Sequence, residues 1–150
     1  MTNENQISLL NDLLTKAYDA EKGYKEAADN VKSNRLKTIF KDMAQQRYDF
    51  GHQIKEEISL LGGEPDKGAS MAAAAHRTWI DIKAALSSND EKAVLEEVVR
   101  GEEQALSSYQ DVLEELPVDG RAYGKMVEQR NAIRTAKDRM EGLEVIADAE

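Results

Sequence analysis

Apolar residues recur at steps of three and four positions along most of the chain, which is the spacing of one face of an α-helix. One such stripe spans residues 7–31 and another spans residues 95–116. A single carboxylate interrupts each stripe, Glu21 in the first and Glu102 in the second. Because a stripe of this kind faces a core, a carboxylate within it has to be paired, protonated or bound to a metal. The two glutamates are therefore the first candidates for a functional site.

Breaks between the stripes predict five helices in a single domain over residues 1–150. Asn and Ser residues gather at residues 30–34, Gly62-Gly63-Glu64-Pro65 is a strong helix stop, and Pro117-Val118-Asp119-Gly120 is a tight break. An S-x-x-E capping box within residues 87–91 is expected to open the fourth helix. We expect the helices over about residues 4–30, 34–61, 70–87, 90–116 and 120–147.

The lengths of the connections predict how these helices are arranged. The first and last connections are short, so each joins two long helices into an antiparallel hairpin. The middle connection is long and carries the short helix 70–87, so it crosses over to bring the second hairpin beside the first. Strand-like alternation is absent, and the composition favours helix. We therefore expect an all-α, ferritin-like four-helix bundle of two antiparallel hairpins, with a long crossover that carries a short extra helix.

The two hairpins also look like an internal repeat. Asp19-Ala20-Glu21 aligns with Arg100-Gly101-Glu102, which places the two interrupting glutamates at matching positions. In the second helix of each hairpin, the stretch from Met43 to Arg47 aligns with the stretch from Met126 to Arg130. One ancestral hairpin used twice would produce this agreement.

Several stretches resemble a known family. They are residues 10–13 (LNDL), 19–28 (DAEKGYKEAA), 60–65 (LLGGEP), 76–85 (HRTWIDIKAA) and 100–103 (RGEE). Together, in this order and spacing, they resemble small bacterial ferritin-like four-helix-bundle proteins of unknown function. The resemblance implies the fold but no activity. By analogy of fold alone it implies a structural or interaction role in bacterial stress, and a homodimer formed through the first two helices.

The ligands of a ferritin-like di-iron site are only half present. Such sites take one Glu from each of two helices and a Glu-x-x-His from each of the other two. Glu21 and Glu102 match the single glutamates, but Glu-x-x-His occurs nowhere in the chain. The nearest pattern, Asp49-x-x-His52, lies off the apolar stripe of its helix. The sequence therefore gives no standard metal site.

Arginines interrupt the stripes of the other two long helices, Arg47 in one and Arg130 in the other, with Lys137 further along. A guanidinium group suits a carboxylate because it offers two parallel donors. We therefore predict a core ion-pair network of Glu21, Arg47, Glu102 and Arg130 in place of a di-metal site. Breaking a buried pair costs about 3–5 kcal/mol, so Glu21→Ala and Glu102→Ala are each expected to destabilise the fold.

Other interpretations of the same residues stay open. Glu21 and Glu102 could form a non-standard iron or manganese site, helped by Asp49, Glu103 or Glu128. His52 and His76 could bind a metal with Asp49, although isolated histidines are more often packing or surface residues. An apolar void beside Glu21 and Glu102 would instead favour a small-molecule carrier. Finally, the charges could simply be solvated.

Composition and motifs narrow the classes of function. The net charge of −9 argues against nucleic acid or an anionic membrane surface as a partner and is compatible with an unidentified protein partner. The chain has no Cys, no phosphate-binding loop, and no Ser with an evident His and Asp beside it. No signal peptide or membrane-spanning stretch is apparent, so a cytoplasmic location is expected. The sequence predicts a non-catalytic protein without a cofactor.

Overall fold

The structure is a computed structural model that describes residues 1–67 and 73–149, with side chains omitted at 73–78 and 146–149. Within these residues the chain forms five α-helices and no strand, which confirms the predicted all-α class. The expected start of the third helix at residue 70 lies outside the described residues. The helices are α1 (Asn3–Asn30), α2 (Asn34–Leu60), α3 (Ala73–Ser88), α4 (Glu91–Glu115) and α5 (Arg121–Ala149).

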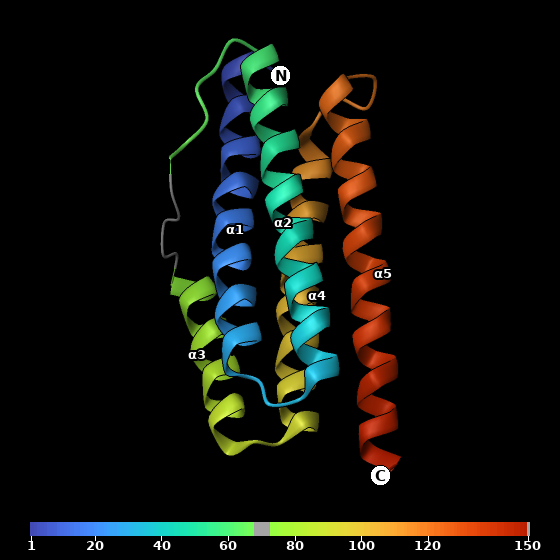
Figure 1. The fold of residues 1–150 in the computed structure, drawn as a ribbon. Helices are drawn as coiled ribbons and strands as arrows, with labels where there is room; N and C mark the ends of the chain where they lie inside the picture. The colour runs from blue at the N-terminus through green and yellow to red at the C-terminus, as the bar shows by residue number, and fades with distance from the viewer. Residues whose placement is uncertain (68–72, 150) are drawn as a thin grey trace.

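The four long helices stand side by side, and each runs antiparallel to its neighbours (Figure 1). α1 packs along α2 and α4, and α5 packs along α2 and α4. In the described part of the chain, α2 and α4 make no close backbone approach, so they lie diagonally across the bundle. The short helix α3 lies outside the four, against α1 and α4, and covers only the lower half of the bundle in this view.

Side-chain caps and one glycine turn set the helix ends. Thr2, Ser33 and Asp90 each accept a hydrogen bond from a backbone N–H in the first turn of α1, α2 and α4, respectively. At the end of α2, Gly62 adopts the left-handed φ of 85°, which glycine reaches at little cost, and the N–H of Gly63 bonds back to the Ile58 carbonyl.

The expected capping box does not open α4. The hydroxyl of Ser88 donates to the carbonyl of Ala85 at 2.7 Å, so it belongs to the end of α3. Asn89 then turns the chain with a φ of 57°, and the Asp90 side chain caps α4 instead. Ser88 is thus committed to the preceding helix, which the pattern S-x-x-E cannot reveal.

A layer of charge divides the core into two apolar halves. Arg47 on α2 and Glu102 on α4 lie at the level where the two halves meet. The lower cluster, nearer the turn between α1 and α2, includes Tyr24, Phe40, Met43, Ile82, Leu95, Val98 and Met140. The upper cluster includes Leu10, Leu14, Phe50, Ile54, Ile58, Met126 and Ile133.

Candidate functional site

Arg47 and Glu102 form a buried ion pair across the diagonal of the bundle. Their side chains are each 3% exposed. The Arg47 guanidinium donates from Nη1 to Glu102 Oε1 at 3.3 Å and from Nη2 to Oε2, so both carboxylate oxygens are engaged. Only long side chains can meet between diagonal helices, and the two-pronged arrangement satisfies the charge that burial would otherwise leave uncompensated.

Tyr24 on α1 completes this polar layer, which we define as Tyr24, Arg47 and Glu102. Its hydroxyl donates to Glu102 Oε1, and its ring lies 5.7 Å from the guanidinium carbon of Arg47. Burial, reinforced by the Glu102 carboxylate, raises the pKa of the Tyr24 hydroxyl well above its usual value. The hydroxyl therefore stays protonated and keeps its hydrogen bond at any physiological pH.

The raised pKa values of Tyr24 and Arg47 do not prepare either group for proton transfer. Burial alone lowers the pKa of Arg47, but Glu102 and two tyrosines outweigh that effect and leave it raised. Burial also raises the pKa of Tyr109, the nearby tyrosine of the upper cluster. A general acid or base works best with a pKa near the ambient pH, so these shifts suit a fixed structural network.

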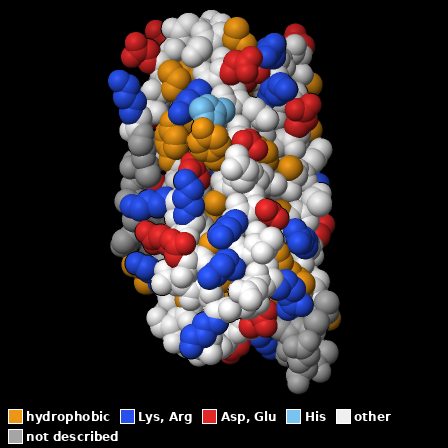
Figure 2. Space-filling view, viewed as in Figure 1, with side chains coloured by type: hydrophobic (Ala, Val, Ile, Leu, Met, Phe, Trp, Pro, Cys, Tyr) orange, Lys and Arg blue, Asp and Glu red, His pale blue; other side chains and the backbone are white. Residues whose placement is uncertain are grey.

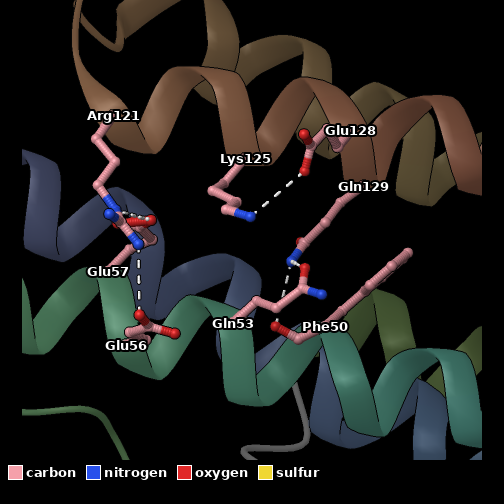
Figure 3. Close-up of polar contacts among 8 residues, drawn as sticks. All are labelled: Phe50, Gln53, Glu56, Glu57, Arg121, Lys125, Glu128 and Gln129. Atoms are coloured by element: carbon pink, nitrogen blue, oxygen red, sulfur yellow. Dashed lines mark hydrogen bonds and ion pairs between the residues drawn. The ribbon is translucent and has the colours of Figure 1, made fainter.

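A second polar network joins α4, α5 and α2 beside the first. The hydroxyl of Tyr109 donates to Gln129 Oε1 at 2.6 Å, and the amide of Gln129 donates to Gln53 Oε1 at 3.0 Å and to the Phe50 carbonyl at 3.3 Å. Figure 3 shows Gln129 reaching from α5 to these two residues on α2. Buried hydrogen bonds of this kind fix the register between the two helices.

An ion pair closes the upper end of the same interface. Arg121, at the start of α5, donates from Nε to the buried carboxylate of Glu57 at 2.8 Å and from Nη2 to Glu56 at 3.3 Å (Figure 3). Because the Arg121 side chain is 60% exposed, this pair is open to solvent on one side. It aligns α2 with α5 and lies apart from the polar layer.

A cavity of about 280 Å³ lies against the polar layer, between α1, α3 and α4. Its wall contains small residues of α1 and α4, among them Ala17, Ala20, Gly101 and Ala105, which leave the space open. Trp79 of α3 forms part of the cavity wall. Its ring meets that of Tyr24 edge to face, with the ring centroids 5.1 Å apart. Further described residues of the lining include Leu13, Tyr24, Arg47, Ile82, Glu102 and Tyr109.

Asp19 lines this cavity with a carboxylate that makes no hydrogen bond to any described residue. The residue is 5% exposed, and both carboxylate oxygens are buried without a hydrogen-bond partner among the described residues. Burial raises the pKa of this carboxyl, and the nearby Lys22 partly offsets the rise. An unpartnered buried carboxylate is rare in native proteins because it loses its hydration without compensation.

Glu21 is not part of the buried network. Its carboxylate accepts from the ammonium of Lys25 one turn along α1 at 2.7 Å, and its side chain is 18% exposed. The inward positions of that turn belong to Gly23 and Tyr24, so Glu21 lies at the edge of the helix interface. In the structure Glu21 thus pairs with Lys25, and the buried carboxylate that meets a core arginine is Glu102.

Arg130 is also outside the network, because the aligned helices differ in phase. On α5 the buried residue is Gln129, and Arg130, turned by about 100° from it, binds the side chain of Asn131 at 3.2 Å. On α2 the arginine is the residue that faces the core. Lys137 pairs with Glu141 at 3.1 Å near the surface.

The proposed metal helpers do not gather around Glu102. Asp49 and Glu103 are exposed, and Glu128 points outward with its carboxylate 3.7 Å from the ammonium of Lys125 (Figure 3). Across the described residues there is no group of three or more His, Asp or Glu side chains that could hold a metal ion.

His52 belongs to a surface patch on α1 and α2. Its ring meets that of the half-exposed Tyr48 edge to face at 4.5 Å, while Lys55 lies over the ring of Tyr18. Figure 2 shows hydrophobic side chains gathered beside a histidine on this side of the bundle. The side chain of His76 lies outside the described residues, so the suggested pairing of the two histidines stays untested.

Sequence reasoning missed Asp19, and it raised a void beside Glu21 and Glu102 only as an open alternative; the cavity is lined by Glu102 and not by Glu21. Asp19 lies two positions before Glu21, about 200° around the helix, and it is therefore off the apolar stripe read from the sequence. Its burial depends on the side of α1 that α3 and α4 approach. The only signal in the sequence is the run of small residues around it, which predicts close helix packing as readily as a void.

Comparison with protein families matches residues 5–115 to the family described as Domain of unknown function (DUF2383), which leaves α5 outside the match. Comparison with curated proteins finds no match. Over the described residues, no helix is both long and apolar enough to cross a bilayer.

Proposed function

Because the chain belongs to the family described as Domain of unknown function (DUF2383), which assigns no activity, we propose a function from the geometry of the core. We propose a non-catalytic, ferritin-like bundle that binds a small molecule in the cavity beside the polar layer. The observation that carries the proposal is a cavity of about 280 Å³ that combines apolar and aromatic walls with a few buried polar groups. Small-molecule sites have this character and usually begin at about 300 Å³.

The Arg47–Glu102 pair supports binding rather than chemistry. In this proposal it occupies the place of a di-iron site and forms one wall of the cavity. Both oxygens of Glu102 are already held by a guanidinium and a phenol, so the carboxylate is not free to ligate iron or manganese. Metal binding is the alternative function. Near-stoichiometric iron or manganese in the purified protein, lost in Glu102→Ala, would favour it over the proposal.

The binding proposal can be tested with the protein's single tryptophan, which lines the cavity. We expect a neutral aromatic probe such as 2-phenylethanol to change the fluorescence of Trp79 in a saturable way. Ala105→Leu places extra volume on the cavity wall and should weaken this binding at least tenfold. Ala84→Leu makes the same change at an exposed position of α3 outside the lining and serves as the control.

Two results would contradict the proposal. Either the wild-type protein gives no saturable response, or both leucine variants bind the probe as well as the wild type does. In the second case the probe would be binding elsewhere on the surface.

A further inference from the structure

Asp19 distinguishes this cavity from a simple apolar void. The carboxylate is buried, lines the cavity and lacks any hydrogen-bond partner among the described residues, whereas the Arg47–Glu102 pair beside it is fully engaged. Burying an ionised carboxylate without a partner is costly. A ligand that brings a hydrogen-bond donor to Asp19 would remove that cost, so the cavity is prepared for one kind of functional group.

The charges around the cavity indicate which functional group of a ligand would suit Asp19. Arg47 and Glu102 cancel each other, so Asp19 adds to the cavity lining one negative charge that no group of the described residues binds directly. Lys16 also lines the cavity, but its ammonium is paired with Asp12 at 2.8 Å and its side chain is 42% exposed. A ligand with a single positive charge therefore complements the wall, and an anionic ligand does not.

On the other side of Asp19, Lys22 lies near enough to lower the pKa of the carboxyl, but it makes no hydrogen bond to either carboxylate oxygen. A second hollow of about 220 Å³ lies there, lined by Asp19, Lys22, Glu26, Trp79 and Lys83. Lys22 is exposed, and the Lys83 ammonium lies 3.9 Å from the carboxylate of Glu26. Neither lysine makes a hydrogen bond to Asp19, whose oxygens have no partner among the described residues.

We propose that Asp19 binds the ammonium group of a small amine whose apolar or aromatic body fills the cavity against Trp79 and Tyr109. This inference rests on the proposed function, because it requires the cavity to be a binding site. Aromatic walls suit a cation as well as an apolar body. The net charge of −9 also favours the approach of a cation over that of an anion.

A first measurement uses the ligand-free protein. Asp19→Asn replaces an unpaired carboxylate with a neutral group of nearly the same shape. If Asp19 has no partner within the protein, this variant should melt at the same temperature as the wild type or higher at neutral pH. A clear fall in melting temperature would show that Asp19 is paired within the chain, which would overturn the proposal.

The second measurement compares two matched probes, 2-phenylethylamine and 2-phenylethanol, which differ in an ammonium against a hydroxyl group. By calorimetric titration, we expect the wild type to prefer the amine at least tenfold. In Asp19→Asn this preference should disappear, while binding of the alcohol stays within about twofold of the wild type. Retained binding of the alcohol shows that the variant is folded and its cavity intact.

The outcomes separate the two proposals. If the alcohol binds in a manner that Ala105→Leu weakens, but the amine binds no better and Asp19→Asn changes neither affinity, the cavity is a binding site and the amine proposal is wrong. If neither probe binds the wild type, the proposed function itself fails, and with it the inference drawn from it.

Discussion

Glu21 and Glu102 carry the same side chain at matching points of two apolar stripes, yet they have different environments. Glu102 is enclosed by the core and bound by Arg47 and Tyr24, whereas Glu21 makes a single ion pair with Lys25 at the edge of α1. A buried charge left without its counterion greatly lowers the stability of the fold, whereas an exposed ion pair within one helix adds little to it. The two glutamates should therefore respond very differently to the same substitution.

Glu102→Ala is expected to lower the free energy of unfolding by about 3–5 kcal/mol, because it leaves the Arg47 guanidinium buried without a counterion. Glu21→Ala is the matched control and should cost less than about 1 kcal/mol, contrary to the expectation from the stripe alone. Urea unfolding of both variants measures the difference. Equal losses in the two variants would contradict the assignment of Glu102 to the core network.

Asp19 should give the stability a distinctive dependence on pH. Burial raises its folded-state pKa above the ordinary value of 3.8, so the folded protein holds this proton more tightly than the unfolded chain does. The contribution of Asp19 to stability therefore falls as the pH rises from 3.8 through the raised pKa. Asp19→Asn has no carboxyl at this position and does not lose stability in this way. The difference in free energy of unfolding between the variant and the wild type, in favour of the variant, should therefore be smallest below pH 3.8 and largest at neutral pH.

Urea unfolding of the wild type and Asp19→Asn at a series of pH values provides the check. If the variant's gain in free energy of unfolding instead became smaller as the pH rises, the folded state would be stabilising the charged carboxylate, contrary to this prediction.

Among the elements, α3 packs on α1 through one unusually close contact. Its Trp79 ring packs directly on Gly23 of α1, where a Cβ atom would overlap the indole. The same ring forms part of the cavity wall and touches Tyr24 of the polar layer. The docking of α3 and the shape of the cavity are therefore coupled through this tryptophan.

Gly23→Ala is expected to displace Trp79 and destabilise the protein by about 1–3 kcal/mol, despite the better helix propensity of alanine. The displaced indole should also emit at longer wavelength, and Trp79 is the only tryptophan in the chain. Gly124→Ala is the control, because a Cβ there meets nothing within 4 Å. It should stabilise α5 by about 0.5–1 kcal/mol. Unchanged emission in Gly23→Ala would contradict the close contact.

For the molecule as a whole, α5 supplies part of the core, although the family match ends at residue 115. Met126, Ile133 and Met140 of α5 have at most 1% of their surface exposed, and they complete both apolar clusters. Burying three such side chains contributes about 5–9 kcal/mol, which is comparable to the total stability of a domain.

Truncation after Leu116 should therefore abolish cooperative unfolding. Thermal melts followed by circular dichroism would test this, with the full chain as reference. A shortened protein that still unfolds in one sharp transition near the wild-type temperature would show that α1 to α4 form a core without α5.

The sequence by itself determined the helical class, because the period of three and four residues and the stop signals are local properties of the chain. It also identified Arg47 and Glu102 as charges in apolar stripes, since periodicity gives the phase of a residue on its own helix. Periodicity cannot show which neighbouring helix covers the residues at the border of an apolar stripe, or how two packed helices are rotated about their own axes. Those rotations leave Glu21 and Arg130 at the edges.

Only the tertiary structure decided that Glu102 meets Arg47 across the diagonal, and that α3 and α4 approach the side of α1 that carries Asp19. The cavity arises from the same packing. A void depends on what several helices fail to fill, so its volume follows from the distances between them and from no single residue.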